Sequence, residues 1–416
     1  MTSIRCWGGC ARAVAALLLA CPLFVSPTLA RGEPTPLRWA DLVRLLEEHP
    51  IQAEAGQRVA AARAQVTTAG AVPNPVLAAE VGLARPGQPS IPNGLEWAAS
   101  ISLPLQWVYE RGLLIDAARA GVDAAQQEAR AARQEALLKL RSLFWLIAHD
   151  RTLLTVLEEM ERQLAELARL STLRVTKGEA RPIEAIRIET ELEQVRGETA
   201  RARAAARAHR DQLAQWLGRD LPADLVVEAD LGALPTSLEQ QDALARLAER
   251  HPLLATDRAR QQQLAAQLEV ERSRRLPALA VTGFYARELD LDRAGAGLEL
   301  SIPLWNFNEG AIRRAEADLA VGQQRLEVDR RELASAVVEA WGQVAGDREA
   351  VLRSQQEILP RAMQTASQME QSFRLGESGL IDIIDARRVL VSVSRDDVTA
   401  QLRLQLELTE LQALTG

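Results

Sequence analysis

Long stretches of the chain carry apolar residues at the spacing of an α-helix. No proline interrupts residues 105–181, and apolar side chains there recur at alternating steps of four and three, the seam of a coiled coil. These positions are Leu153, Leu157, Met160, Leu164 and Leu167. The pattern predicts a helix over about 108–176, which at 1.5 Å per residue extends for about 100 Å. After a glycine turn, a second helix is expected over about 179–217.

The second half of the chain repeats this pattern. Helical periodicity runs over about 308–375 and resumes over about 378–413 after another glycine turn. Pro360 is expected to kink the first of these helices, because proline lacks the amide hydrogen and crowds the preceding turn. Helices on the order of 100 Å are rods, far longer than a globular domain of this size requires.

Four shorter segments alternate apolar and polar residues, which predicts β-strands with one apolar face. They lie at about 76–84, 96–105, 278–287 and 296–304. The third is the least regular. In the fourth, one face carries Leu298, Leu300, Ile302 and Leu304. The intervening hairpin loops, 85–94 and 288–294, are polar or proline-rich.

Such alternation fits either two hairpins of a soluble sheet or strands that cross a membrane. Strands of about 9 to 11 residues have the tilted length that a bilayer requires. Four strands cannot close a barrel, and an open edge in lipid leaves backbone groups unsatisfied, so several chains would have to pool their strands. Two chains give about eight strands, whose side chains fill the interior, and three give twelve, which can leave a lumen.

The chain is an internal duplication, because short motifs recur in the same order at an offset of about 200 residues. The pairs are Glu48-His-Pro50 with Arg250-His-Pro252, Pro75-Val-Leu-Ala78 with Pro277-Ala-Leu-Ala280, Ser102-Leu-Pro-Leu105 with Ser301-Ile-Pro-Leu304, and Lys177-Gly-Glu-Ala180 with Leu375-Gly-Glu-Ser378. The predicted repeats cover 31–217 and 237–416, joined by a turn-rich linker over 218–236. Together they are expected to form one intertwined structural unit.

The first thirty residues predict a secretory signal peptide. Arg5 and Arg12 precede an apolar stretch that is too short for a spanning helix, and Ala30 ends the segment at a cleavage site. A second interpretation takes Leu18-Leu-Ala-Cys21 as a lipoprotein box, although the apolar run continues past Cys21. All three cysteines lie in this segment, so no disulfide or thiol chemistry is expected in the mature chain unless Cys21 carries lipid.

Composition and candidate chemistry argue against an enzyme. Aromatic residues make up only 4%, and the abundance of Ala, Glu, Arg and Gln is typical of long packed helices. The net charge is −7, and because the leader contains two arginines and no acid, its removal makes the charge −9. An acidic chain is a poor binder of nucleic acid. The sequence contains no phosphate-binding loop, dinucleotide fingerprint or mature cysteine nucleophile.

The four histidines, His49, His149, His209 and His251, are scattered along the chain. None has a second ligand at helical spacing, so neither a metal site nor a cofactor is expected. His49 and His251 occupy equivalent places in the two repeats, each before a proline, and are expected to help end a short helix.

With this order of elements, the chain resembles the outer-membrane efflux factors, the TolC-like family, over essentially all of its mature length. Phe373-Arg-Leu-Gly-Glu-Ser-Gly-Leu-Ile-Asp-Ile-Ile-Asp-Ala386 is similar to the family's second periplasmic tip, and Val175-Thr-Lys-Gly-Glu-Ala-Arg-Pro-Ile-Glu-Ala185 is its counterpart in the first half. The segments Gly70-Ala-Val-Pro-Asn-Pro-Val-Leu-Ala78 and Ser301-Ile-Pro-Leu-Trp-Asn-Phe-Asn-Glu-Gly310 resemble the heavy-metal, CzcC-like branch.

The resemblance implies a mainly α-helical fold with a small membrane β-barrel, built as a homotrimer of twelve strands and twelve long helices. Such a trimer would lie in the outer membrane of a Gram-negative bacterium, surrounded by its lipid, and extend into the periplasm. Its partners would be a periplasmic adaptor protein and a proton-driven inner-membrane pump of the RND class. Its role would be to conduct what the pump delivers across the periplasm and the outer membrane.

The resemblance also implies a gate at the periplasmic end. Asp382 and Asp385 occupy the positions of the family's acidic rings, where carboxylates around a narrow pore repel one another and attract cations. Alternatively, both aspartates simply favour the N-terminus of the following helix. Gly178 and Gly376 are expected to form the tip turns, where the family contacts its adaptor. The apolar candidates for that contact are Leu375, Leu380 and Ile381.

The sequence departs from the family's closed-state latch. Glu184 occupies the place of an acidic acceptor, but the tyrosine and the arginine that would bond to it correspond here to Phe373 and Ser378, which cannot form those bonds. A latch in this chain would need other chemistry, for which Arg181 and Arg374 are candidates.

Two other protein classes share some of these features. A periplasmic adaptor also contains long helical hairpins, but as one hairpin within β-rich domains, and a structural coiled coil would lack the strands.

For a duct, the CzcC-like resemblance favours divalent cations such as zinc, cobalt, cadmium or copper as the substrate. Drugs or other small organic molecules are the alternative.

Overall fold

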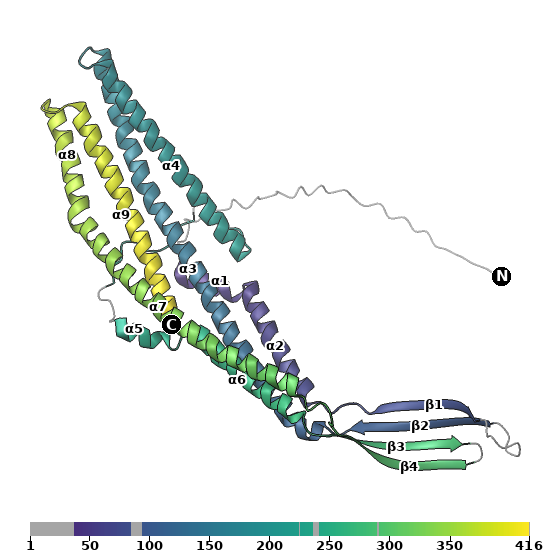
Figure 1. The fold of residues 1–416 in the computed structure, drawn as a ribbon. Helices are drawn as coiled ribbons and strands as arrows, with labels where there is room; N and C mark the ends of the chain where they lie inside the picture. Colours follow the sequence, from purple (N-terminus) through teal and green to yellow (C-terminus); the bar gives the residue numbers. More distant parts are fainter. Residues whose placement is uncertain (1–36, 85–93, 224, 236–240, 289–290, 416) are drawn as a thin grey trace, which may run out of the picture. The chain divides into compact units, whose positions relative to one another are not determined.

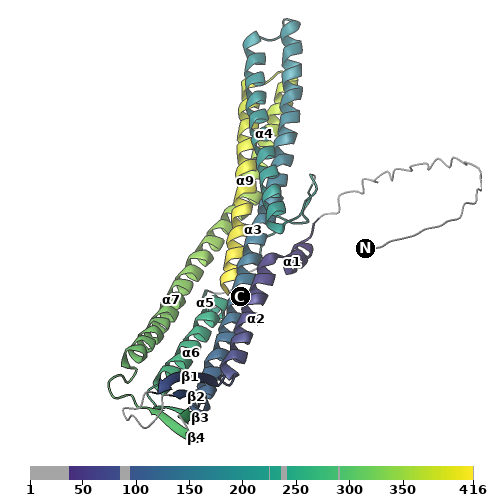
Figure 2. The ribbon, with the colours of Figure 1, turned by 90° about the vertical axis from the view of Figure 1, so that its right-hand side faces the viewer.

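A computed structural model describes residues 37–84, 94–223, 225–235, 241–288 and 291–415 (Figures 1 and 2). The predicted signal peptide and Cys21 lie outside these ranges. The described residues form long helices and one small antiparallel sheet, which confirms the mainly helical fold with four strands. None of the helices in these ranges combines the length and the apolar character needed to cross a membrane.

The elements follow the same order in both halves of the chain. The first half contains α1 (Trp39–Glu47), α2 (Pro50–Gly70), β1 (Val76–Ala84), β2 (Gly94–Pro104), α3 (Trp107–Thr176) and α4 (Pro182–Leu217). The second half contains α5 (Gln241–Ala248), α6 (Pro252–Ser273), β3 (Ala278–Glu288), β4 (Leu291–Ser301), α7 (Glu309–Arg353), a π-helical turn (Ser354–Ile358), α8 (Leu359–Leu375) and α9 (Leu380–Thr415).

Histidine caps the start of both medium helices. His49 precedes α2 and His251 precedes α6, and the Nδ1 atom of each accepts a hydrogen bond from the backbone amide two residues later, at 3.2 and 3.1 Å. The proline after each histidine fills the first helical position, where no amide hydrogen is needed. The two histidines therefore begin the medium helices. Their own amides also donate to the carbonyl oxygens of Leu46 and Ala248, at 3.1 and 2.9 Å, so they help end the short helices as expected.

The expected break at Pro360 takes the form of a π-helical turn. Residues Ser354–Ile358 separate α7 from α8, and the amide of Leu359 donates to the carbonyl oxygen of Ser354, five residues back. Pro360 then lies in the first turn of α8. The wider turn accommodates a residue without an amide hydrogen, so the helical path continues beyond it.

The long helices pack as two hairpins. α3 and α4 form the first and α8 and α9 the second, and α9 also packs along α3 (Figure 1). The apolar cluster that joins the hairpins includes Leu157, Met160, Leu164, Ile188, Leu192, Leu380 and Ile384. Three positions of the predicted 4–3 seam belong to it and are at most 5% exposed, because a partner helix buries such a seam.

Shorter helices cover the other part of α3. α2 and α6 pack along it, and α7 packs against both α6 and α9 (Figure 2). A second apolar cluster joins α1 and the linker to α3, with Leu42, Leu46, Leu140, Phe144 and Leu231 in it. Together with the cluster between the hairpins, which draws residues from both halves, these contacts give the two halves a shared core.

The four strands form one antiparallel sheet in the order β1-β2-β3-β4. The halves of the chain meet in its middle, where β2 pairs with β3. β1 and β4 are the edges, and neither outer edge pairs with another described strand. The register brings the apolar residues to one face: Leu77 lies opposite Ile101, and Val281 lies opposite Leu298.

β4 begins earlier than the alternation predicts. The expected strand covers 296–304, whereas β4 covers Leu291–Ser301, and Asp292 and Arg293 pair with β3 inside the expected loop. A ladder is made by backbone groups, so it continues through charged residues that the side-chain pattern assigns to a loop. Ile302 and Leu304 follow the strand.

Candidate functional site

The apolar face of the sheet is exposed. Trp97 and Tyr285 lie side by side on β2 and β3, with ring centroids 5.3 Å apart. The most exposed large apolar residues of the strands are Leu77, Val81, Leu83 and Leu298, each more than 70% exposed. Water-soluble monomers rarely expose a continuous apolar surface of this kind, so the face fits an apolar environment.

Glycine forms both tip turns. Gly178 has a φ of +77° and Gly376 a φ of +79°, a conformation that costs a residue with a Cβ atom about 1–2 kcal/mol. At the second tip, the amide of Gly376 donates to the carbonyl oxygen of Phe373 at 3.0 Å. Both turns reverse the chain at the end of the hairpins away from the sheet (Figure 1). A role of the two glycines in adaptor contact stays a prediction.

Asp382 caps α9. Its Oδ2 atom accepts a hydrogen bond from the amide of Gly379 at 2.9 Å, and an acidic group in the first turn also suits the helix dipole. Asp385 lies about one turn further on, with its side chain 66% exposed and Oδ1 3.7 Å from Nη1 of Arg388. The helix-starting role therefore applies to Asp382. This contact and a gate role do not exclude each other.

Glu184 and Phe373 lie in separate contacts. Glu184 pairs with Arg181, at the start of the same helix, with Nε and Oε1 3.3 Å apart. Phe373 packs against the cluster shared by the two hairpins, and the guanidinium carbon of Arg174 lies 5.1 Å from its ring centroid. Arg374 pairs within α8. Neither Arg181 nor Arg374 thus reaches the other hairpin in this conformation.

The apolar tip residues divide into exposed and buried positions. Leu375 is 74% exposed and Ile381 is 45% exposed, so both present apolar surface beside the second tip turn. Leu380, between them in sequence, is 5% exposed and packs in the inter-hairpin cluster. Its side chain is therefore a packing group here, and only Leu375 and Ile381 offer a surface to a partner.

Two consecutive arginines of α9 connect the hairpins just below the tips. Arg388 forms a bidentate ion pair with Glu191 of α4, with Nη2–Oε2 at 2.5 Å and Nε–Oε1 at 3.2 Å. Arg387 bonds to Glu370 of α8 and to Gln163 of α3. The Glu191 side chain is 10% exposed, so loss of this partner would leave a nearly buried carboxylate unpaired. The sequence pattern alone gives no signal for these contacts, because they join residues far apart in the chain.

His149 and His209, which are far apart in the chain, meet at one buried carboxylate. Nδ1 of His149 lies 3.2 Å from Oδ1 of Asp150, and Nδ1 of His209 lies 2.6 Å from Oδ2. Asp150 is 4% exposed. The antiparallel pairing of α3 with α4 brings these residues together. Within the described ranges, no group of three His, Cys, Asp or Glu residues could hold a metal ion.

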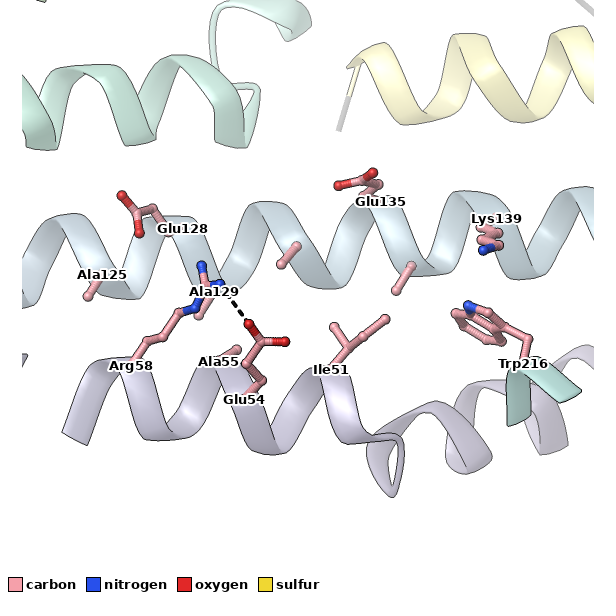
Figure 3. A pocket seen from close by; sticks show the side chains of 12 residues that line it. Ile51, Glu54, Ala55, Arg58, Ala125, Glu128, Ala129, Glu135, Lys139 and Trp216 are labelled. Carbon is pink, nitrogen blue, oxygen red and sulfur yellow. Dashed lines mark hydrogen bonds and ion pairs between the residues drawn. The ribbon is translucent and has the colours of Figure 1, made fainter. Parts of the chain in front are cut away.

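A cleft of about 300 Å³ between α2 and α3 has the character of a packing groove (Figure 3). Alanines, including Ala55, Ala125 and Ala129, separate the charged residues along it, and Trp216 closes one end. Glu54 pairs with Arg58 one turn along α2, at 2.6 Å. None of the described residues that line this cleft is Ser, Thr, Cys or His, so it offers no hydroxyl, thiol or imidazole nucleophile.

The fold defines the class of protein. The crystal structure of CusC matches 91% of this chain and 92% of its own, with a TM-score of 0.76 and 15% identity. The outer membrane protein VceC of Vibrio cholerae matches 91% of this chain and 96% of its own, with a TM-score of 0.74 and 17% identity. This is the fold of outer-membrane channels. The sequence profile described as outer membrane efflux protein matches residues 42–219 and 243–416, and the chain belongs to that family.

A relative in sequence also supports the class of outer-membrane efflux proteins. The cobalt-zinc-cadmium resistance protein CzcC of Cupriavidus metallidurans is 26% identical over 296 residues, which are 70% of either chain. Membership of the family confirms two predictions: the chain is an outer-membrane efflux protein, and it is not an enzyme.

Proposed function

We propose that three copies of this chain form the outer-membrane duct of a tripartite efflux system. Twelve strands would close a barrel in the lipid, and twelve long helices would continue it as a tube into the periplasm. A periplasmic adaptor and a proton-driven inner-membrane pump of the RND class would deliver the substrate. The duct itself supplies a path and a gate, without a chemical step.

The observation that carries this proposal is the open sheet with its exposed apolar face. In lipid, every unpaired backbone group at the edges of β1 and β4 would cost several kcal/mol, so the edges must pair with those of other copies. Twelve strands leave room for a lumen, whereas about eight would be filled by side chains. Trp305 and Phe307, directly after β4, are 93% and 48% exposed and suit the aromatic girdle at a membrane interface.

The gate of the duct is proposed at the tips, from Asp382, Asp385, Glu184 and Phe373. Repetition around a threefold axis would gather the carboxylates of Asp382 and Asp385 around one opening, where they attract cations and resist close approach. The contact of Phe373 with Arg174 joins α8 to the end of α3. It therefore supports a closed arrangement in which the two hairpins hold each other.

Adaptor contact is proposed at the tip turns, Gly178 and Gly376, and at Leu375 and Ile381. The two apolar side chains are exposed beside a turn whose shape is fixed by a glycine with positive φ. An exposed apolar residue on a rigid turn is a suitable anchor for a partner protein. Leu380 supports this surface from below through its buried packing.

Divalent heavy-metal cations are the proposed substrate. The support is the relationship to CzcC, whose name refers to cobalt, zinc and cadmium, together with acidic residues at the proposed gate. A strain that lacks this chain should become sensitive to zinc, cobalt, cadmium or copper and regain resistance when the chain is supplied. Sensitivity to organic drugs alone would assign the duct to the alternative substrates, and no change for either class would contradict an efflux role.

A further inference from the structure

Two aspartates are buried against one another between α6 and α7. Asp257 of α6 is 7% exposed and Asp329 of α7 is 2% exposed. Oδ2 of Asp257 and Oδ1 of Asp329 are buried without a hydrogen-bond partner among the described residues, and the interaction with Asp329 contributes to a raised pKa of Asp257. Ionised carboxylates only accept hydrogen bonds. Two carboxyl groups can therefore form a hydrogen bond to each other only if one of them carries a proton.

The charged groups around the pair differ for the two aspartates. Nε of Arg325, on α7, donates to Oδ2 of Asp329 at 2.8 Å. Arg260, on α6, lies near Asp257 but is engaged by Glu128 of α3, at 2.9 and 2.7 Å. Asp329 therefore has a dedicated cation, while Asp257 has none. Among described residues, the charges that act on Asp257 are those of Asp329, Arg260 and Arg325, with none from α5 or α9.

The remaining titratable groups nearby are already accounted for. Arg330, the residue after Asp329, pairs with Glu249 and with Glu327, both at 3.1 Å. His251, at the start of α6, has a pKa that burial lowers from its ordinary value. Its Nδ1 atom accepts a hydrogen bond from the amide of Leu253, as the neutral form of the ring can.

We propose that Asp257 and Asp329 form a proton-binding site, in which one shared proton bonds the two carboxyl groups and ties α6 to α7. A metal ion fits less well, because Arg325 occupies one oxygen of Asp329 and no group of three possible ligands occurs in the described ranges. The site depends only on the contact between the two helices, so it stands or falls independently of the proposed duct.

The site makes the packing of α6 on α7 sensitive to pH. Burial, followed by the contact with Asp329, raises the pKa of Asp257 to about 6 from its ordinary value of 3.8. Between these values the folded chain holds a proton that the unfolded chain has released. The free energy of unfolding therefore falls as the pH rises through this window, and the stabilisation by the bound proton is lost above it. Loss of the proton leaves two like charges in one buried contact, which pushes the helices apart.

The two helices of the site are adjacent in the chain to strands of the sheet. α6 leads into β3, and α7 follows β4. At 1.5 Å per residue, Asp257 lies about 24 Å from the end of α6. A proton at this site would thus stabilise the helix pair that supports β3 and β4.

Infrared difference spectroscopy of the purified full chain, titrated between about pH 4 and 9, tests the site directly, because a protonated carboxyl group has its own C=O band. The expected result is a band that disappears with a midpoint near pH 6 and is absent from both Asp257→Asn and Asp329→Asn. The matched control is Asp318→Asn on the same helix, where the side chain is 55% exposed, and it should keep the band. A wild-type spectrum without such a band overturns the proposal.

Thermal unfolding supplies a second readout. The wild type should unfold at a lower temperature at about pH 8 than at about pH 5, and Asp257→Asn should lose most of this difference, because its amide donates to Asp329 at every pH. His251 is present in both proteins, so its titration cancels in the comparison. An equal pH response in wild type and variant would overturn the coupling. So would a rise in unfolding temperature with added zinc that Asp257→Asn abolishes, because the site would then hold a metal ion.

Discussion

Arg388 of α9 and Glu191 of α4 form a bidentate ion pair that joins the two helical hairpins. Glu191 is nearly buried, with its side chain 10% exposed, whereas Arg388 is 58% exposed. Any movement that separates the tips of the hairpins has to break this pair and leave the carboxylate without its counter-charge. The pair therefore opposes separation of the two hairpins.

Arg388→Ala should open the tips. The variant leaves Glu191 unpaired in a nearly buried site, and loss of one partner of such a pair is strongly destabilising. We expect single-channel conductance in planar bilayers to rise by about twofold or more, because the inter-hairpin contact that opposes pore widening is lost. Arg162→Ala is the matched control, since Arg162 pairs with Glu159 within α3 and its side chain is 74% exposed. Equal conductance of wild type and Arg388→Ala would contradict the role of the Arg388–Glu191 pair in opposing opening.

Substitutions at the two aspartates of the second tip should distinguish a structural role from an electrostatic one. Asp382→Ala removes the oxygen that accepts from Gly379 and should lower stability by about 1 kcal/mol, as loss of a helix cap does. Asp382→Asn keeps an acceptor oxygen and removes the charge. Combined with Asp385→Asn, it should raise conductance and weaken cation selectivity while leaving the unfolding temperature nearly unchanged. Unaltered conductance and selectivity in this double variant would rule out a gate role for the two carboxylates.

Two glycine-to-alanine substitutions should have opposite signs. Gly376 has a φ of +79°, so Gly376→Ala should destabilise the protein by about 1–2 kcal/mol. Gly342 lies inside α7, where an added Cβ atom meets nothing within 4 Å, so Gly342→Ala should stabilise it by about 0.5–1 kcal/mol. Chemical denaturation measures both. A neutral Gly376→Ala would mean that the tip turn does not need its left-handed backbone.

The repeat and the helical periodicity predicted most of the fold. Leu157 and Leu164 are core residues because a 4–3 seam requires a partner helix, and the repeat required a second hairpin of the same kind. β4 was less predictable: its start at Leu291 depends on backbone pairing with β3, and side-chain alternation carries no information about backbone pairing. Pro360 predicted a break, but the π-helical form of that break depends on how α7 packs.

The site was predictable only where local geometry determines it. Gly178 and Gly376 are predictable as turn residues because glycine tolerates a positive φ. For Asp382, its position in the chain predicts a helix start as the alternative to the gate role. The pairs Arg388–Glu191 and Asp257–Asp329 gave no such signal. They depend on the rotation and the axial register of helices from distant segments. Hydrophobic periodicity predicts which face of a helix is buried, but not which residues on two helices meet.

The central claim is that the exposed sheet edges of several copies pair to close a pore. The most direct measurement is the oligomeric state and shape of the detergent-extracted mature protein, by light scattering combined with negative-stain imaging. The account predicts a trimer with a tube on the order of 100 Å or longer, as the helical rise of α3 requires. A monomer or a compact particle would contradict it, because the edges of β1 and β4 would then remain unpaired.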